Sequence, residues 1–180
     1  MAFTSARACG PYQGAWRETV LWLKAHPQIA PRIRRSLAST LSLLCEANPV
    51  DSVVPVPLHP ERERARGFNQ AEVIARALTD ATGLRLDRAS LTRVRPTKPH
   101  RAGMDASERA RSLDGAFRVR APRLIAGRAI LIVDDVMTTA ATAHEIAVTL
   151  LGAGARSVSL MTLARVTCAP RGTRPDILSE

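Results

Sequence analysis

The sequence predicts an α/β fold in which helices flank a central, mainly parallel sheet. Short apolar segments alternate with longer segments whose apolar residues recur every three to four positions, as in amphipathic helices. The clearest example is a strand over 129–133, a helical stripe over 143–151 and a strand over 157–163. This order favours parallel strands, and 180 residues suffice for one buried core, so we expect a single domain over residues 1–166.

The N-terminal part predicts two helices before the first strand. Residues 1–14 are expected to be irregular, because Gly10 and Pro11 break regular structure. A short helix should follow and end before Pro27, with its apolar face formed by Trp16, Val20 and Leu23. Pro31 is well placed to open the second helix, whose apolar stripe consists of Ile33, Leu37, Leu41 and Leu44.

The middle of the chain predicts a strand, a basic loop and a helix. Ser52–Val56 is a short apolar strand that its prolines end or bend. Residues 60–66 are expected to form a basic loop, with Gly67 as its pivot. Apolar residues with helical spacing follow over 71–81, and Gly83 is suited to end that helix.

Residues 95–115, here called the hood segment, form a polar connection without periodicity between expected strands at 91–94 and 116–119. A connection of this length inside a compact domain is either disordered or a functional lid. The tail over 167–180 contains two prolines and few apolar residues, so we expect it to be loose.

The chain has a net charge of +10. That excess favours polyanionic partners, either phosphorylated metabolites or nucleic acid. Genome composition is an alternative source of the charge, since Lys24 and Lys98 are the only lysines among many arginines. No apolar run approaches the roughly 20 residues that span a membrane, and no secretory signal is evident, so we expect a cytoplasmic protein without a membrane span.

Segment 130–142 has the strongest chemical signal. Asp134 and Asp135 follow a buried strand, and a helix begins shortly after them. A helix N-terminus offers free amides and a positive dipole end to a phosphate, and the loop adds hydroxyls and small residues at Thr138, Thr139, Ala140, Ala141 and Thr142. The carboxylates would repel a phosphate and instead suit ribose hydroxyls or Mg²⁺. The alternative is a strand end with solvated acids and a threonine helix cap.

A second candidate region follows the strand at 52–56. Arg62, Arg64 and Arg66 precede Gly67 and a helix start, and arginine forks bind phosphate oxygens in pairs. Ligands of parallel α/β sheets bind beyond the carboxyl ends of the strands, so both regions could face one cleft. A solvated run of surface charges is the alternative.

The hood segment adds Lys98 and Arg109, which could cover a charged intermediate and exclude water. A disordered charged loop is the alternative. His59 and His100 are candidate acid or base groups, or else incidental loop residues.

Together these residues resemble the type I phosphoribosyltransferases, whose phosphoribosyl-pyrophosphate loop corresponds to residues 130–142. More narrowly, the chain resembles the ComF/GntX family, which is linked to DNA-uptake competence. The motifs that carry this resemblance are Val54-Pro55-Val56-Pro57-Leu58-His59, Arg66-Gly67-Phe68-Asn69-Gln70, Tyr12 with Gly14 and Lys24, and Glu108-Arg109 leading to Gly115-Ala116-Phe117.

The resemblance implies a type I phosphoribosyltransferase-like fold with a flexible hood, and displacement of pyrophosphate at an anomeric carbon. It implies that Asp134 and Asp135 are the catalytic and metal-binding residues, holding ribose hydroxyls directly or near Mg²⁺. The loop 138–142 would cradle the 5′-phosphate, and the loop 64–67 would face the pyrophosphate. Ala140 stands where the family loop has glycine, and a positive φ there would cost roughly 1 kcal/mol or more.

Two functional hypotheses follow. In the first, the protein binds phosphoribosyl pyrophosphate with Mg²⁺ and transfers the phosphoribosyl group to an unknown nitrogenous base. In the second, it is a non-catalytic accessory or sensor protein that binds a phosphoribosyl ligand, or contacts single-stranded DNA or the DNA-uptake machinery. Aromatic residues make up only 3% of the chain, which weakens the case for base stacking on DNA. The resemblance also suggests a homodimer.

Overall fold

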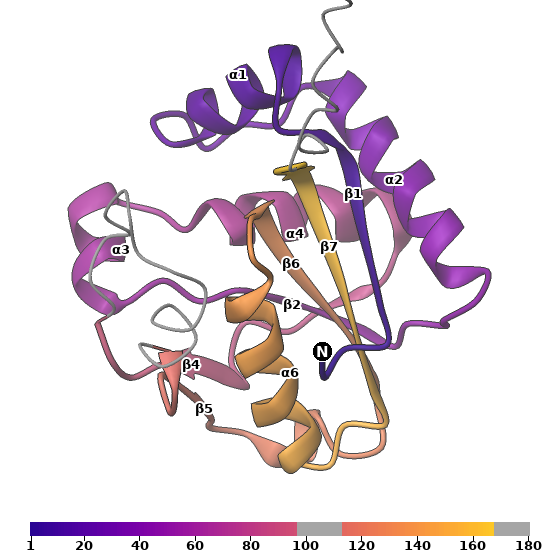
Figure 1. The fold of residues 1–180 in the computed structure, drawn as a ribbon, viewed down its shortest axis with the longest axis vertical. Coiled ribbons are helices and arrows are strands. Elements are labelled where there is room, and N and C mark those ends of the chain that lie inside the picture. The colour runs from indigo at the N-terminus through magenta and orange to yellow at the C-terminus, as the bar shows by residue number, and fades with distance from the viewer. Residues whose placement is uncertain (97–112, 168–180) are drawn as a thin grey trace, which may run out of the picture.

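The computed structural model describes residues 1–96 and 113–167, which form a five-stranded sheet, a two-stranded hairpin and the surrounding helices (Figure 1). The strands are β1 (Ser5–Pro11), β2 (Ser52–Pro55), β3 (Arg85–Leu86), β4 (Leu91–Arg93), β5 (Phe117–Val119), β6 (Ala129–Met137) and β7 (Ser157–Arg165). The helices are α1 (Gly14–Leu23), α2 (Pro31–Cys45), α3 (Pro60–Arg66), α4 (Gln70–Thr82), α6 (Ala141–Gly152) and the short 3₁₀ turn η1 (Pro122–Leu124). No helix within the described ranges has both the length and the apolar character needed to cross a bilayer.

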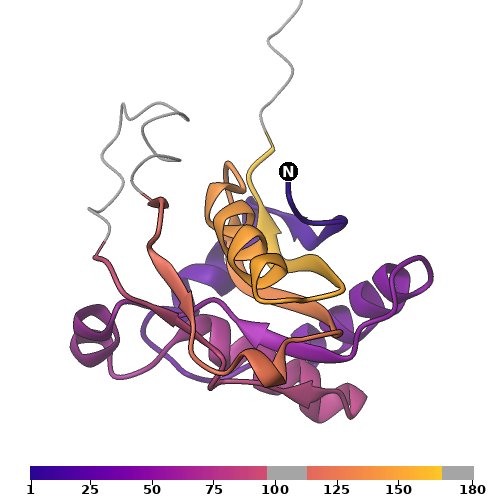
Figure 2. The same ribbon diagram turned by 90° about the horizontal axis from the view of Figure 1, so that it is seen from below.

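The main sheet has the strand order β1-β7-β6-β2-β3, and every neighbouring pair in it is parallel. Side chains of β6 alternate between two cores: Leu131 and Val133 pack with α1, α2 and α4, whereas Ile130 and Ile132 pack with α6 and the β4–β5 hairpin. Figure 2 accordingly shows α6, in orange, and α4, in magenta, on opposite sides of the sheet. Burial of both faces explains the unbroken apolar run of β6. The predicted α/β fold is confirmed.

The prediction of an irregular segment over residues 1–14 is wrong. Ser5–Pro11 forms an edge strand parallel to β7, and Ser5 Oγ donates to Ser159 Oγ at 3.0 Å. Pro11 lies at the very end of this strand, where proline is tolerated. Because an edge strand derives its structure from a partner far along the chain, its local sequence gives only a weak signal.

Residues 60–66 form helix α3, so the predicted loop is also wrong. Pro60 occupies the first helical position, and the ring Nδ1 of His59 accepts a hydrogen bond from the Glu61 amide at 3.4 Å. Acidic residues in the first turn and arginines in the last turn suit the helix dipole. None of the seven residues is buried, so α3 lacks the apolar period from which helices are predicted.

Strand β6 extends to Met137, beyond the predicted end at residue 133. Asp134 and Asp135 therefore lie within the strand and not in the loop that follows it. Strand β7 continues beside them, with Asp134 paired in register to Thr162. The longer pairing gives both carboxylates a rigid backbone.

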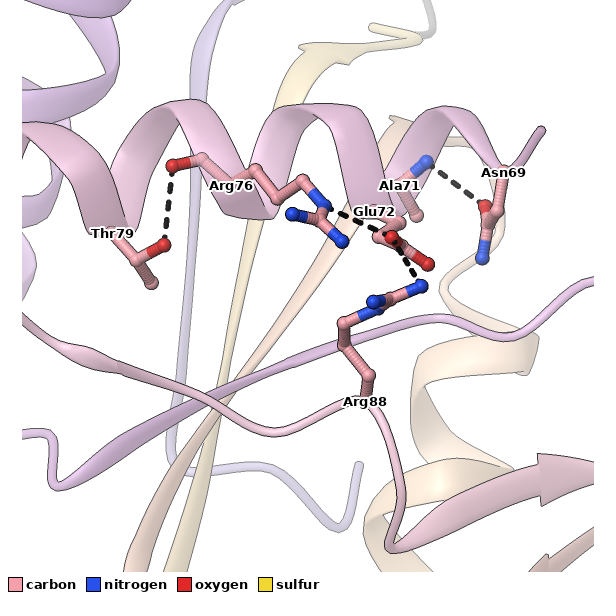
Figure 3. Close-up of polar contacts among 6 residues, drawn as sticks. All are labelled: Asn69, Ala71, Glu72, Arg76, Thr79 and Arg88. Carbon is pink, nitrogen blue, oxygen red and sulfur yellow. Dashed lines mark hydrogen bonds and ion pairs between the residues drawn. The ribbon is translucent and has the colours of Figure 1, made fainter.

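The N-terminus of α4 is fixed to the end of β2 by Asn69 (Figure 3). The Asn69 side chain accepts from the Ala71 amide at 3.0 Å and donates to the Val56 carbonyl at 2.9 Å. One turn further on, a carboxylate oxygen of Glu72 accepts from both Arg76 and Arg88, at 3.0 and 2.8 Å. These contacts hold the start of α4 in a defined position at the carboxyl edge of the sheet.

Replacing Gly10 with alanine is expected to destabilise the protein. A Cβ at this position of β1 would overlap the indole ring of Trp16, which lies in the first turn of α1. Overpacking of this kind costs about 1–3 kcal/mol. Thermal unfolding measures the effect. The matched control is Gly152→Ala at the end of α6, where a Cβ meets no atom within 4 Å, and an equal loss of stability in both variants would contradict the prediction.

Candidate functional site

A cleft of about 420 Å³ opens at the carboxyl ends of β2 and β6. Its walls come from α1, α3, the start of α4, the hairpin strand β4, the end of β6 and the start of α6. The side chains able to bind charged or hydroxylated groups there are Tyr12, Lys24, Arg62, Arg66, Gln70, Arg93, Asp134, Asp135, Thr138 and Thr142. The two regions that the sequence places at strand ends thus face one cleft.

The turn between β6 and α6 presents the N-terminus of α6 to this region. Ala140 immediately precedes the helix and has a left-handed backbone, with φ 57° and ψ 10°. No side chain in the described ranges caps α6, so the amides of its first turn remain available to another acceptor. A hollow of about 30 Å³ lies here, lined by all of the residues 136–143 together with Leu113, Asp134, Leu160 and Thr162. Such an arrangement suits an anion.

Replacing Ala140 with glycine is expected to stabilise the protein. The left-handed conformation disfavours a Cβ by about 1–2 kcal/mol, and the greater freedom of glycine in the unfolded chain offsets part of this. We expect the free energy of unfolding to rise by about 0.5–1 kcal/mol. In a domain of this size each kcal/mol raises the melting temperature by roughly 2–4 °C. The matched control is Ala141→Gly in the first turn of α6, which should lower the melting temperature. A lower melting temperature in Ala140→Gly would contradict the backbone strain that we infer at this position.

The two carboxylates at the end of β6 have different surroundings. An oxygen of Asp134 accepts from the Asp135 amide at 2.9 Å, and an oxygen of Asp135 accepts from the Val136 amide at 2.7 Å. Although part of Asp134 is still exposed, burial of its carboxyl raises its pKa well above the ordinary value of 3.8, and the charge of Asp135 raises it further. The positive charge of Arg93 acts in the opposite direction but does not prevail. A cation bound nearby would therefore stabilise the ionised form of Asp134.

The donor set at this point suits Mg²⁺ only together with a ligand. The described residues contain no group of three or more histidine, cysteine, aspartate or glutamate side chains placed to hold a metal ion. Mg²⁺, however, commonly takes one or two carboxylates and completes its shell with water and substrate phosphates. Asp134 and Asp135 fit that partial role.

The basic wall of the cleft is formed by one face of α3. Arg62 and Arg66 are four residues apart, so they project from the same side of the helix, and both line the cleft. Arg64 projects elsewhere, and its Nε donates to the Pro60 carbonyl at 3.3 Å. Gly67 ends α3 with φ 83° and turns the chain toward α4. Of the three arginines before Gly67, the structure thus places Arg62 and Arg66 in the cleft and Arg64 outside its lining.

Arg93, on β4, is a site residue that the sequence reasoning missed. Its guanidinium lies over the Phe117 ring, 5.4 Å from the centroid, and the residue lines the cleft. Burial and, to a lesser extent, Arg62 lower the pKa of Arg93, whereas Asp134 raises it. The residue belongs to a separate hairpin, so the strand-end rule for parallel sheets does not point to it. Arg62, by contrast, is one of the three arginines that the sequence analysis places before Gly67.

The hood segment meets the described structure at its two ends. Arg95 Nη1 donates to the Asp114 carbonyl at 3.2 Å, and the Gly115 amide donates to Glu145 of α6 at 3.0 Å. Lys98, Arg109 and His100 lie outside the described residues. Within the described part, the hairpin β4–β5 packs beside α6 and supplies Arg93 to the cleft.

Comparison with known proteins identifies relatives. The family model of the phosphoribosyl transferase domain matches residues 23–176. DNA utilization protein YhgH of Salmonella typhi is 40% identical over 115 residues, which cover 64% of this chain and 49% of that protein. Competence protein F of Haemophilus influenzae is 31% identical, covering 64% and 50%, and Competence protein ComFC of Bacillus subtilis is 36% identical, covering 63% and 44%. The chain spans about half the length of these relatives.

Among solved structures, a purine phosphoribosyltransferase from Pyrococcus horikoshii Ot3 aligns with a TM-score of 0.46 and 14% identity, covering 91% of this chain and 84% of that one. A likeness this distant adds nothing to the functional argument. The named relatives confirm the resemblance to ComF proteins, and the parallel sheet with helices on both faces agrees with the family match. The chain therefore belongs to the phosphoribosyltransferase domain family and has the type I phosphoribosyltransferase fold.

Proposed function

We propose that the protein binds phosphoribosyl pyrophosphate together with Mg²⁺ and transfers the phosphoribosyl group to a nitrogenous base. The observation that carries this proposal is the meeting of three kinds of group in one region. A carboxylate pair ends β6, an uncapped helix N-terminus with threonines follows it, and arginines from α3 and β4 lie across the cleft. These groups match, in turn, the ribose hydroxyls, the 5′-phosphate and the pyrophosphate of the ligand.

Each part of the ligand has a chemically suited partner. The amides of the first turn of α6 and the hydroxyls of Thr138 and Thr142 would bind the 5′-phosphate. The carboxylates of Asp134 and Asp135 would accept hydrogen bonds from the ribose hydroxyls. The guanidinium groups of Arg66 and its neighbours Arg62 and Arg93 would bind the pyrophosphate.

The reaction follows from these positions. A nitrogen lone pair of the base forms a bond to the anomeric carbon as the bond from that carbon to the pyrophosphate oxygen breaks. The electron pair of the broken bond leaves with pyrophosphate, and the attacking nitrogen loses its proton to water. Positive charge develops on the sugar, which the carboxylate of Asp134 stabilises, and the arginines stabilise the departing anion. Bound Mg²⁺ would supply further neutralisation of the pyrophosphate charge.

Calorimetric titration with phosphoribosyl pyrophosphate, with and without Mg²⁺, tests the binding step. We expect binding that Mg²⁺ strengthens, because the two carboxylates need a cation to face an anionic ligand. Incubation with the same ligand and a panel of bases should then release pyrophosphate. Absence of binding heat under both conditions would overturn the proposal, whereas binding without turnover on any base would restrict it to a sensor.

A second candidate function is that of an accessory protein that contacts single-stranded DNA or the DNA-uptake machinery. The net charge of +10 favours it, as do the names of the relatives, which refer to DNA utilization and competence. Binding to single-stranded DNA at low salt, weakening steeply as salt rises, would support this function. The absence of binding at low salt would contradict direct contact with single-stranded DNA.

The homodimer remains a prediction that sedimentation can check.

A further inference from the structure

The side chain of Gln70 contains a buried hydrogen-bond donor that no group among the described residues accepts. Gln70 is the first residue of α4, is only 2% exposed and lines the cleft. Its Oε1 accepts a hydrogen bond from Arg66 Nη1 at 2.6 Å. Across residues 1–96 and 113–167, its Nε2 has no hydrogen-bond partner.

The contact with Arg66 fixes which end of the amide is the nitrogen. A guanidinium has donors only, so it can face only the amide oxygen of Gln70. The NH₂ group must then point away from Arg66. Roughly nine in ten buried polar groups in proteins have a partner, and an unpaired buried donor is costly, so this one calls for an acceptor that is bound during function.

The neighbouring residue gives an internal comparison. Asn69 has the same amide chemistry, but both of its ends are occupied: its oxygen by the Ala71 amide (Figure 3) and its nitrogen by the Val56 carbonyl. Its role is to hold the start of α4. Gln70 therefore differs from Asn69 in having an unpaired donor among the described residues, and Gln70 is one of the residues that line the cleft.

The surroundings indicate an anionic acceptor. Gln70 lies at the N-terminus of a 13-residue helix, where the helix dipole is positive. Arg66 adds a full positive charge at hydrogen-bonding distance, and Arg62 lines the same cleft. A negatively charged oxygen is the acceptor that best satisfies this combination.

We propose that Gln70 Nε2 donates a hydrogen bond to a phosphate oxygen of the pyrophosphate group, so that Gln70 and Arg66 bind the leaving group as one unit. This inference rests on the proposed function and extends it to a residue on α4. It assigns Gln70 to recognition of the leaving group, while the α6 loop recognises the other end of the ligand.

Two variants and two probes test the inference. Gln70→Glu keeps the oxygen that Arg66 contacts but removes the donor, and Gln70→Met removes both polar ends without adding charge. Calorimetry with inorganic pyrophosphate and Mg²⁺ should show binding weakened about 10- to 100-fold in both. Binding of ribose 5-phosphate, the probe of the α6 loop, should stay unchanged. Gln28→Glu repeats the charge change at an exposed position between α1 and α2 and should leave both affinities unchanged.

Thermal unfolding of the ligand-free variants separates binding from a purely structural role. Gln70→Glu buries a carboxylate, but it also gives Arg66 an ionised acceptor, so the two effects should offset and the melting temperature should change little. Unchanged pyrophosphate affinity in both variants, in a protein whose wild type binds phosphoribosyl pyrophosphate, would overturn this inference alone. Equal weakening of both probes would also overturn it, as general damage. A wild type that binds neither phosphoribosyl pyrophosphate nor pyrophosphate would overturn the proposed function as well.

Discussion

Replacing Asp134 with asparagine is expected to weaken ligand binding strongly and, at the same time, to make the ligand-free protein more stable. Asparagine still offers an oxygen to the Asp135 amide, which now contacts Asp134 at 2.9 Å. It removes the burial cost of a charge and its repulsion by Asp135, the two largest of the causes that raise the pKa of Asp134. Two charge-assisted hydrogen bonds to ribose hydroxyls, about 1.5–3 kcal/mol each, would be lost, so affinity should fall about 100-fold or more.

The stability gain should depend on pH in a defined direction. Because the pKa of Asp134 is higher in the folded protein than its ordinary value of 3.8, the folded state binds the proton more tightly than the unfolded state does. The free energy of unfolding of the wild type should therefore fall as pH rises from about 4 through the raised pKa. The asparagine variant lacks this titration, so its advantage in melting temperature should grow with pH until that pKa is passed and then level off.

Melting curves across this pH range, with calorimetry for phosphoribosyl pyrophosphate at pH 7, check both effects. Asp80→Asn is a suitable control, since Asp80 is exposed on α4 and makes a surface ion pair with Arg34 at 3.9 Å. Such a pair contributes about 0–1 kcal/mol. A wild type more stable than the Asp134 variant at pH 7 would contradict the predicted cost of the buried carboxylate.

Replacing Arg93 with methionine should weaken phosphoribosyl pyrophosphate binding about 10- to 100-fold, the contribution of one hydrogen-bonded charge. The same change should destabilise the ligand-free protein. Arg93 is the cation that partly offsets the raised pKa of Asp134, and its guanidinium packs over Phe117 at 5.4 Å. Calorimetry and thermal unfolding measure the two effects. Arg95→Met, at an exposed position two residues further on, serves as the control.

A double-mutant cycle separates the two roles of Arg93. If Arg93 supports Asp134 electrostatically, the stability loss from Arg93→Met should shrink when Asp134 is already asparagine. The remainder would include the contact with Phe117. Arg93→Lys keeps the charge but loses the planar fork, so it should retain the support of Asp134 and still lose part of the ligand affinity. Equal stability losses in both backgrounds would show that Arg93 and Asp134 are not coupled.

Much of the fold could be predicted because its central elements carry strong local patterns. The apolar run of β6, the apolar stripe of α6 and the apolar run of β7 each predict the right element from the local sequence alone. The elements that were missed lack such patterns. Strand β1 forms through pairing with β7, and helix α3 buries no residue, so neither shows an apolar period.

The candidate site divides in the same way. Asp134, Asp135 and the loop 138–142 are contiguous in sequence, so a strand end followed by a helix start was enough to point to them. The sequence did not show which arginines lie near these residues. That depends on residues 60–66 forming a helix and on where the β4–β5 hairpin packs. Arg62 and Arg66 share one face of α3, and Arg93 comes from a hairpin outside the main sheet.

The sequence by itself determined the parallel α/β architecture and the loop suited to phosphate and ribose, since both follow from short-range periodicity and from residue chemistry. Tertiary structure alone decided which charges meet across the cleft. It raised the pKa of Asp134 through burial, which the approach of Arg93 only partly offsets, and within the described residues it left one donor of Gln70 unpaired beside Arg66. Burial and distance between remote residues are properties of the packed chain, and no local pattern encodes them.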